Sequence, residues 1–432
     1  MTQRGEDLPS RAVVPLLSPP DATVVIPGSK SYTNRALILA ALAQGTSTIT
    51  NALVADDSEA MLEALDALGV VVERDDKQWL VQGLGGAIPA GPLNINARFS
   101  GTTSRFLLPV LALGVGPYVL DGHEPLRKRP IGPIAEALLT LGAEVEDVDG
   151  TGLNFLPLSV RGGNLSGGQV EVSAEFSSQF VTGLLQAGPY MRRGLTLNMV
   201  EATASRPYLT MTTSVMSAFG VTVERPNENQ FVVPAGGYVA TTYEVEPDAS
   251  TASYVFAAAA ITGGRIRVPG LGRRSLQGDM AFLDVLSQMG AHVEVNEDWS
   301  EVRGSADIRG VDIDMSDFPD MAQSVAAVAV FGDKPTRVRG VSLIRHHETD
   351  RIRAVVTEMR RLGIQAEEFD DGFVIHPGTP QPAQVETYDD HRMAMSFALL
   401  GLRVPGIEIV DPVCVGKTFP GFFDVLDSLG AN

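Results

Sequence analysis

Apolar positions recur along the chain in a short pattern, apolar-x-x-apolar-Gly, that closes one amphipathic run after another. The six glycines that end these runs lie 67 to 78 residues apart: Gly69, Gly142, Gly220, Gly290, Gly363 and Gly430. An amphipathic run that stops at glycine and is followed by alternating residues is typical of a helix leading into a strand. The pattern therefore predicts six repeated βα units.

A second series of runs has the same period but is apolar on nearly every side. These runs begin near six residues: Lys30, Thr102, Ser178, Ser250, Asp320 and Arg392. A helix without a polar face must be buried, so we expect each unit to pack one buried and one outer amphipathic helix on a sheet. The chain is therefore predicted to have an α/β fold.

The two ends of the chain bear on its division into domains. Gly430 has no strand after it, whereas residues 11–27 contain an apolar strand, ATVVIP, without a repeat helix before it. We infer that the N-terminal segment completes the sixth unit, so that one domain contains both termini. Six units divide most simply as three plus three, into residues 1–27 with 247–432 and residues 28–246. Six domains of about 70 residues are the alternative, but they would leave apolar surface uncovered.

Composition and charge narrow the classes of function. The 432 residues are 44% apolar and 20% charged, as in folded globular proteins. Net charge is −19 and no basic stripe occurs, which argues against nucleic acid as a partner. Without an apolar stretch of about 18 residues or a secretory signal, the chain is expected to be cytoplasmic and to have no membrane partner. The single cysteine, Cys414, excludes an internal disulfide, no metal-ligand spacing is present, and we expect a monomer.

Cationic and hydroxyl side chains are concentrated where the buried helices are predicted to begin, for example at Lys30, Arg35, Arg105 and Arg392. Helix N-termini expose N–H groups that attract anions, and equivalent ends of repeats should lie together. One such residue alone is more often an ordinary cap or surface charge. Six in phase favour a polyanionic small substrate in a cleft between the two domains.

Three further stretches carry candidate chemistry. EPLRKRPIG places Arg127–Arg129 before a predicted helix, where guanidinium groups suit phosphate or carboxylate. In RHHETDRIR, Glu348 and Arg351 have the spacing of a capping box or a same-face ion pair. CVGKTFPGFF carries Lys417 in a predicted turn. The chain has no GxxxxGK[ST], no GxGxxG between strand and helix and no GxSxG, so nucleotide and serine-hydrolase sites are unsupported.

The chain resembles the EPSP synthase family of enolpyruvyl transferases in nine motifs, which occur in this order over residues 27–423: PGSKSYTNR, SGTTSRF, EPLRKRPIG, SSQF, SRPY, PDMA, HETDR, DDHRMAM and KTFPGFF. The resemblance implies the two-domain enolpyruvyl transferase fold, an inside-out α/β barrel with three βαβαββ units in each domain. It also implies a reaction of the shikimate pathway, in aromatic amino-acid and chorismate biosynthesis. The enolpyruvyl group of phosphoenolpyruvate moves to the 5-hydroxyl of shikimate 3-phosphate and phosphate leaves, without a metal or organic cofactor.

The same resemblance implies roles for individual residues. Asp320 resembles the base on the 5-hydroxyl, while Glu348 and Lys30 resemble the groups that move the proton at C3 and at the bridging oxygen, through a tetrahedral intermediate. Phosphoenolpyruvate would be bound by Lys30, Gly101, Arg129, Gln179, Arg351, Arg392 and Lys417. Shikimate 3-phosphate would be bound by Ser31, Arg35, Ser177, Ser178, Gln179, Ser205, Tyr208, Asp320 and His347. For His391, a structural hydrogen bond is at least as well supported as proton transfer.

Two positions depart from the family pattern. Phe99 stands where the family commonly has Asn, so an aromatic ring replaces an amide near phosphoenolpyruvate. His347 stands where the family commonly has Lys, so a titratable and weaker donor would face shikimate. These departures bear on affinity and on the response to inhibitors such as glyphosate more than on the reaction.

Other functions remain as alternatives. UDP-N-acetylglucosamine enolpyruvyl transferases share the fold and the donor, but typically carry a reactive Cys in the loop that here reads HEPLRKRP. A catalytically silent relative that binds phosphorylated metabolites would not need two carboxylates, Asp320 and Glu348, beside an anionic substrate. A purely structural α/β repeat is disfavoured by the cationic openings.

Overall fold

The runs that are apolar on every side form the buried helices of two units. The computed structural model, which describes residues 9–75, 77–200 and 206–430, divides into unit 1, residues 1–27 with 247–432, and unit 2, residues 28–246. The buried helices are α1 (Lys30–Leu42), α3 (Gly101–Leu111) and α6 (Ser178–Ala187) in unit 2, and α8 (Ala249–Thr262), α10 (Ala322–Ala329) and α12 (His391–Gly401) in unit 1. Each begins within two residues of the predicted position, which confirms the second series.

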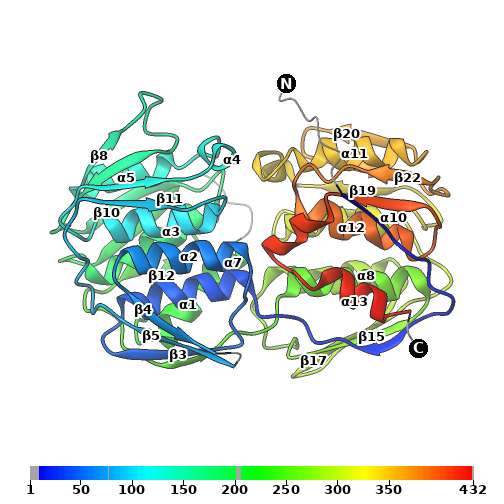
Figure 1. Ribbon diagram of the computed structural model, residues 1–432, viewed down its shortest axis with the longest axis horizontal. Coiled ribbons are helices and arrows are strands. Elements are labelled where there is room, and N and C mark those ends of the chain that lie inside the picture. Colours follow the sequence, from blue (N-terminus) through cyan, green and yellow to red (C-terminus); the bar gives the residue numbers. More distant parts are fainter. Residues whose placement is uncertain (1–8, 76, 201–205, 431–432) are drawn as a thin grey trace. The chain divides into compact units, whose positions relative to one another are not determined.

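These helices pack side by side within each unit (Figure 1). In unit 1, α8, α10 and α12 contact one another, and their Ser253, Ser324 and Ser396 hydroxyls meet at 3.3 and 3.4 Å. In unit 2, α3 packs against both α1 and α6. The α3 and α6 backbones approach so closely at Gly183 that an added Cβ would lie 2.2 Å from the Arg105 carbonyl oxygen.

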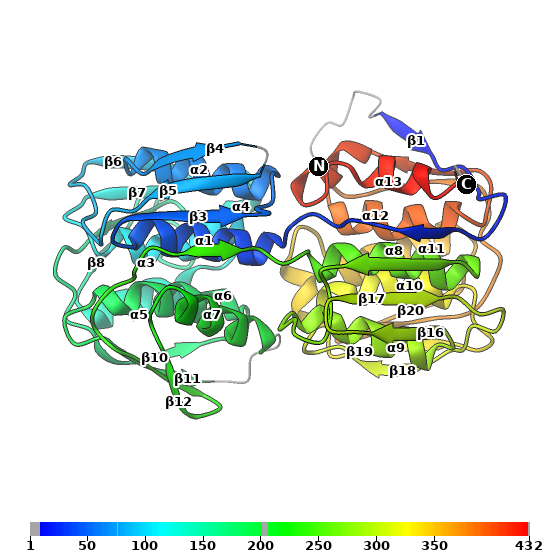
Figure 2. The ribbon, with the colours of Figure 1, turned by 90° about the horizontal axis from the view of Figure 1, so that it is seen from below.

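Small sheets of one recurring topology surround the helices. In each, two parallel strands are followed by antiparallel strands. The orders are β14-β3-β5-β4, β6-β7-β9-β8 and β10-β11-β13-β12 in unit 2, and β2-β15-β17-β16, β18-β19-β21-β20 and β22-β23-β1 in unit 1. Figure 2 shows β3, β5 and β4 lying side by side next to α1 and α2. Over the described ranges the strands thus form six separate open sheets around helices and no closed barrel.

The remaining elements of unit 2 follow the predicted βαβαββ order. Its strands are β3 (Thr46–Thr50), β4 (Val71–Arg74), β5 (Gln78–Gln82), β6 (Leu93–Asn96), β7 (Tyr118–Asp121), β8 (Glu144–Asp147), β9 (Leu158–Arg161), β10 (Gly168–Ser173), β11 (Leu195–Val200), β12 (Glu224–Asn227), β13 (Gln230–Val233) and β14 (Thr242–Glu244). Its other helices are α2 (Asp56–Ala67), α4 (Glu124–Arg127), α5 (Gly132–Leu141), the 3-10 helix η1 (Gly188–Tyr190) and α7 (Pro207–Ala218).

Unit 1 has the same order. Its strands are β1 (Ser10–Ala12), β2 (Asp21–Thr23), β15 (Arg265–Pro269), β16 (His292–Val295), β17 (Trp299–Arg303), β18 (Asp312–Asp314), β19 (Thr336–Arg339), β20 (Ala366–Phe369), β21 (Gly372–Ile375), β22 (Ala383–Val385) and β23 (Ile407–Val410). Its other helices are α9 (Phe282–Gln288), α11 (Arg351–Arg361) and α13 (Phe422–Ser428), with the 3-10 helices η2 (Gly278–Ala281), η3 (Pro319–Met321), η4 (Ser342–His346) and η5 (Pro412–Lys417).

The strand that completes the sixth unit is not the expected one. β1 pairs antiparallel with β23, whereas β2, which begins the ATVVIP stretch, pairs parallel with β15. The reason is the exchange of strands where the chain passes between units. β14 precedes α8 in sequence but pairs with β3 of unit 2, so the parallel place beside β15 is filled by β2.

Five of the six repeat glycines have the left-handed conformation that a helix-ending glycine supplies. Their φ angles run from 77° to 103° at Gly69, Gly142, Gly220, Gly290 and Gly363. Gly430 is not among the positive-φ residues, so the prediction is wrong there. It is the second residue after α13, which ends at Ser428.

Gly183→Ala is expected to lower the free energy of unfolding by about 1–3 kcal/mol, because the new methyl group would press on the Arg105 carbonyl of α3. Denaturant unfolding followed by circular dichroism measures the loss. Gly421→Ala is the control, since nothing lies within 4 Å of a Cβ added there and its φ is −86°. Equal stability of the two variants would contradict close packing of α3 on α6.

Candidate functional site

A buried arginine organises the charged residues of unit 1. The Arg351 side chain is 2% exposed, and its Nε and Nη2 donate to Asp390 at 2.7 and 3.2 Å. Its Nη1 lies 2.8 Å from Asp320 Oδ1, and its Nη2 lies 2.9 Å from Glu348 Oε2. The Glu348–Arg351 ion pair confirms one of the two readings of their spacing. The N-cap of α11 is instead Asp350, whose side chain accepts from the Arg353 backbone.

Asp320 lies between two arginines. Its second oxygen, Oδ2, accepts from Arg392 Nη2 at 2.9 Å, while the side chain is 21% exposed. Burial alone would raise the pKa of Asp320, but the positive charges of Arg392 and Arg351 outweigh it and hold that pKa well below 3.8. The carboxylate is therefore ionised, as a base must be, but its basicity is low while both arginines contact it.

Glu348 is held in the same way. Its two oxygens are divided between Arg351 Nη2 and Lys417 Nζ, the latter at 2.6 Å. Lys417 ends η5, so the KTFPGFF stretch does bring its cation to the HETDR stretch. The structure thus brings together the unit 1 residues that the sequence singled out.

Local backbone structure fixes the arginine of the DDHRMAM stretch. Asp390 caps α12 by accepting from the Arg392 backbone N–H at 2.9 Å, while its oxygens also hold Arg351. The two residues before it, Tyr388 and Asp389, both have φ of 57°. Two successive left-handed residues without glycine are strained, and such strain persists only where surrounding contacts enforce it.

The predicted unit 2 residues also gather at helix starts. Lys30, the first residue of α1, pairs with Asp57 of α2 at 3.2 Å. Ser100 caps α3 by accepting from the Thr103 backbone N–H, and the Thr103 hydroxyl donates to the Asp57 carbonyl at 3.5 Å. The starts of α1, α2 and α3 therefore lie together, as the dipole argument expects.

Arg35 lies deeper than a surface cation. The residue is 2% exposed, and its guanidinium donates to Thr212 at 2.9 Å, to the Ser31 carbonyl at 2.9 Å and to the Tyr208 carbonyl at 3.3 Å. Burial lowers the pKa of Arg35 to about 10, so the side chain remains charged at pH 7. These bonds tie α1 to α7, and Tyr208 lies at the start of α7.

The start of α6 is joined to α3. Arg105 Nη1 donates to Gln179 Oε1 at 2.9 Å and to Ser177 Oγ at 3.4 Å. Gln179 in turn donates to Thr102 at 3.3 Å. Ser177 caps α6 by accepting from the Gln179 backbone N–H, and Ser178 is buried beside it.

Only part of the EPLRKRPIG stretch reaches this cluster. The Arg129 guanidinium lies about 3.0 Å from the place of a Cβ on Gly101, so glycine makes room for it. Arg127 and Lys128 instead pair with neighbouring carboxylates of Asp121 and Glu124. Of the three cations expected to bind phosphate or carboxylate, only Arg129 therefore lies at the helix starts.

Phe99 and His347, the two departures from the family pattern, each contact other side chains. The Phe99 ring, 47% exposed, stacks on His123 with ring centroids 4.4 Å apart. His347 Nδ1 lies 3.0 Å from Arg351 Nη1 and 3.5 Å from Asp320 Oδ1. His391 is 1% exposed, with Nδ1 3.8 Å from Asp390. Ser205, expected to bind shikimate 3-phosphate, lies outside the described residues.

Sequence reasoning missed several carboxylates that set these charges. Asp57 and Asp390 carry the ion pairs to Lys30 and Arg351, and Asp279 of η2 accepts from Ser250 Oγ at 2.8 Å. Asp390 is the second residue of the DDHRMAM motif, and its place before a predicted helix could have marked it as an N-cap. Asp57 and Asp279 have no local signal, because only the tertiary fold brings them to helix starts that are distant in sequence.

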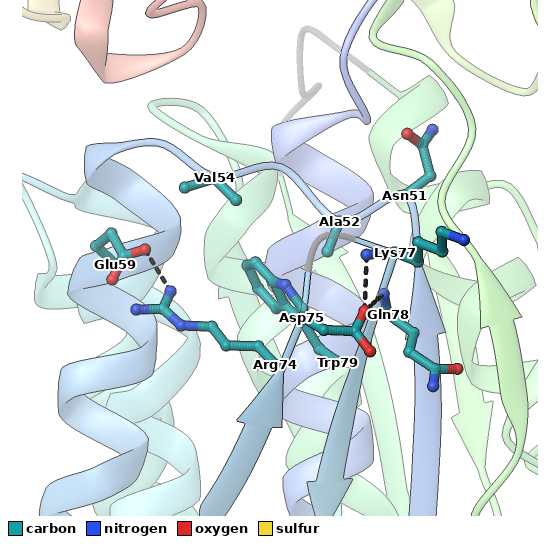
Figure 3. Close-up of a pocket in the computed structure, with 9 residues that line it drawn as sticks. All are labelled: Asn51, Ala52, Val54, Glu59, Arg74, Asp75, Lys77, Gln78 and Trp79. Atoms are coloured by element: carbon teal, nitrogen blue, oxygen red, sulfur yellow. Dashed lines mark hydrogen bonds and ion pairs between the residues drawn. The ribbon is translucent and has the colours of Figure 1, made fainter.

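A separate hollow lies in unit 2 beside the hairpin of β4 and β5 (Figure 3). It has a volume of about 460 Å³, and Figure 3 shows Arg74 reaching to Glu59 on one side while Trp79 lies at its back. None of the sequence-predicted site residues lines it. The clusters at the helix starts, not this hollow, are therefore the candidate site.

In the part of the chain that the structure describes, no group of three or more His, Cys, Asp or Glu side chains is arranged to hold a metal ion. Among the same residues, no helix has the length and apolar character needed to cross a bilayer.

Two α/β units with cations and carboxylates at converging helix starts define a class of enzyme that handles polyanionic small molecules. The family model for EPSP synthase (3-phosphoshikimate 1-carboxyvinyltransferase) matches residues 17–426, and the chain belongs to this family. A 3-phosphoshikimate 1-carboxyvinyltransferase of Nostoc punctiforme is 47% identical over 95% of this chain and 97% of its own, and one of Aliivibrio fischeri is 43% identical over 95% and 97%. The solved EPSP synthase of Acinetobacter baumannii has a TM-score of 0.85 at 26% identity over 98% of each chain. The fold predicted from the resemblance is thus confirmed.

His347 is expected to be neutral at pH 7 with its proton on Nε2. An arginine has only donors, so Nδ1 must accept from Arg351, and burial lowers the pKa of His347 below 6.5. Nitrogen-15 NMR of the imidazole rings, assigned with His347→Gln, measures both the tautomer and the titration midpoint. His376, which lies on the surface beside Glu367, is the internal comparison. An imidazolium signal from His347 at pH 7 would refute this tautomer.

Proposed function

We propose that this chain transfers the enolpyruvyl group of phosphoenolpyruvate to the 5-hydroxyl of shikimate 3-phosphate and releases phosphate. Its membership in the EPSP synthase family over residues 17–426 carries the proposal. The residue pattern supports it, because both substrates are polyanions and both clusters offer arginine or lysine beside a carboxylate. The enzyme is a transferase of the shikimate pathway.

In this proposal Asp320 takes the proton of the 5-hydroxyl. The arginines that hold its pKa low are those expected to bind phosphoenolpyruvate, Arg351 and Arg392. When the substrate's phosphate and carboxylate share these cations, the positive charge that acts on Asp320 is partly neutralised. Its basicity then rises in the complex, so that substrate binding prepares the base for proton transfer.

Glu348 and Lys30 move the protons on phosphoenolpyruvate. Lys417 and Arg351, which hold Glu348, are also expected to contact that substrate, so the same exchange applies to the second carboxylate. As C3 is protonated, the 5-oxygen adds to C2 and gives a tetrahedral intermediate. Loss of a C3 proton then expels phosphate, and Lys30 can donate to the departing oxygen.

The remaining substrate contacts are proposed from unit 2. Ser177, Ser178 and Gln179 at the start of α6 suit the phosphate of shikimate 3-phosphate, because a helix N-terminus and hydroxyl donors favour an anion. Arg35 and Ser31 lie at the start of α1, and Arg129 lies against Gly101. We further propose that the chain works as a monomer in the cytoplasm, with residues of both units acting on one pair of substrates.

Asp320→Asn is expected to lower kcat by about 10²–10⁴-fold, because the amide cannot accept the 5-hydroxyl proton. Phosphate release from phosphoenolpyruvate, with shikimate 3-phosphate as acceptor, measures the rate. Asp317→Asn is the matched control, an exposed carboxylate three residues away. A wild-type rate in Asp320→Asn would contradict the assigned base, and release with UDP-N-acetylglucosamine in place of shikimate 3-phosphate would contradict the acceptor.

A further inference from the structure

A buried carboxylate that has no part in the reaction scheme lies behind the arginine of α12. Asp279 is 4% exposed, in η2, and its Oδ2 accepts from Ser250 Oγ at 2.8 Å. Ser250 lies in the first turn of α8, against which η2 packs. The same Ser250 oxygen lies 3.3 Å from Arg392 Nη2. Asp279 is thereby linked to Arg392 through one hydroxyl group.

The direction of these hydrogen bonds follows from the chemistry of the groups. Arginine has only donors, so Ser250 must accept from Arg392. A serine hydroxyl has one hydrogen, and an ionised carboxylate can only accept. The Asp279 carboxylate therefore takes the Ser250 hydrogen, which turns the oxygen lone pairs toward Arg392. Without the Asp279 acceptor, the Ser250 hydroxyl can rotate, and its lone pairs are no longer held toward the Arg392 guanidinium.

The charged groups around Asp279 come from three other elements. Asp320 of η3 and Asp248, the N-cap of α8, raise its pKa, whereas Arg392 of α12 lowers it. Burial is the largest influence, and together these groups raise the pKa of Asp279 from 3.8 to about 6. The side chain is thus ionised at pH 7 and above and gains a proton in mildly acidic solution.

Resting on the function proposed above, we propose that Asp279 is a positioning residue that holds Arg392, through Ser250, in place for the anionic groups of phosphoenolpyruvate. Arg392 also donates to Asp320 at 2.9 Å and to the Tyr254 hydroxyl at 3.4 Å. Asp320 is the proposed base, so it must be free to turn to the 5-hydroxyl during the reaction. Asp279 and Ser250 keep the guanidinium in place when Asp320 leaves it.

A double-mutant cycle on the whole protein tests this linkage. Ser250→Ala and Asp279→Ala are each expected to raise KM for phosphoenolpyruvate about tenfold, with kcat within about twofold of wild type. The double variant should show no greater rise than the larger single one, because both substitutions break the same link. Independent, multiplying effects, or a loss confined to kcat, would overturn the proposal.

Asp279→Asn adds a conservative comparison that also guards against a misfolded Asp279→Ala. Its amide oxygen can still accept from Ser250 but cannot titrate, so at pH 8 its KM should lie closer to wild type than that of Asp279→Ala. In wild type, KM for phosphoenolpyruvate should rise as the pH falls through about 6, and this component should be missing in Asp279→Asn. The substrate's own phosphate titrates equally in both, so only the difference between the two profiles is compared.

The outcomes separate this proposal from the function on which it rests. If wild-type protein releases no phosphate with shikimate 3-phosphate, the proposed function fails, and calorimetric titration with phosphoenolpyruvate alone then measures the effect of the same variants on binding. If the wild type is active but all three variants keep its KM for phosphoenolpyruvate, only the role of Asp279 fails. Identical pH profiles of wild type and Asp279→Asn would likewise overturn it.

Discussion

Arg351 carries a full positive charge in a side chain that is only 2% exposed. Such a buried charge has to be compensated by opposite charges, and the structure of unit 1 around it provides them. Three carboxylates reach it from the start of α12, from η3 and from the turn before α11. Removing one partner of such a buried group typically costs about 3–5 kcal/mol, because the other charge is left without compensation. The elements that carry these carboxylates are therefore fixed relative to one another by one guanidinium.

The repeat explains why the ends of helices from distant parts of the sequence meet there. Within unit 1, each βαβαββ repeat turns the N-terminus of its buried helix toward the same end. Ser250 of α8, Asp320 beside α10 and Arg392 of α12 therefore come within hydrogen-bonding distance. Unit 2 does the same with the starts of α1, α3 and α6, although the residues differ. Repetition thus supplies a common arrangement of backbone donors, and variation of side chains within it supplies the chemistry.

The parts of this arrangement that depend on local pattern could be predicted from the sequence. A run without a polar face has to be buried, and a glycine such as Gly290 ends its helix in a conformation that other residues avoid, so the order of the elements follows. Strand exchange could not be predicted, because β1 and β2 are three residues each and neither sequence shows which strand it will pair with. Asp57 and Asp279 could not be predicted for a related reason. Nothing near them in sequence shows that the fold brings Asp57 to Lys30 and Asp279 to Ser250 and Arg392.

The charged groups around Arg351 in unit 1 do not add up to a net positive charge, which bears on how an anionic substrate can bind there. Arg351, Arg392 and Lys417 pair with Asp320, Glu348 and Asp390, three charges of each sign. Asp279 adds a further carboxylate behind Arg392, and His347 adds no charge when neutral. On the function proposed above, a substrate anion gains little from net charge and binds by taking the place of a carboxylate beside a cation. Each such exchange frees a carboxylate from the cation that suppressed its basicity, so in this proposal binding of the anion and the creation of a base are one event.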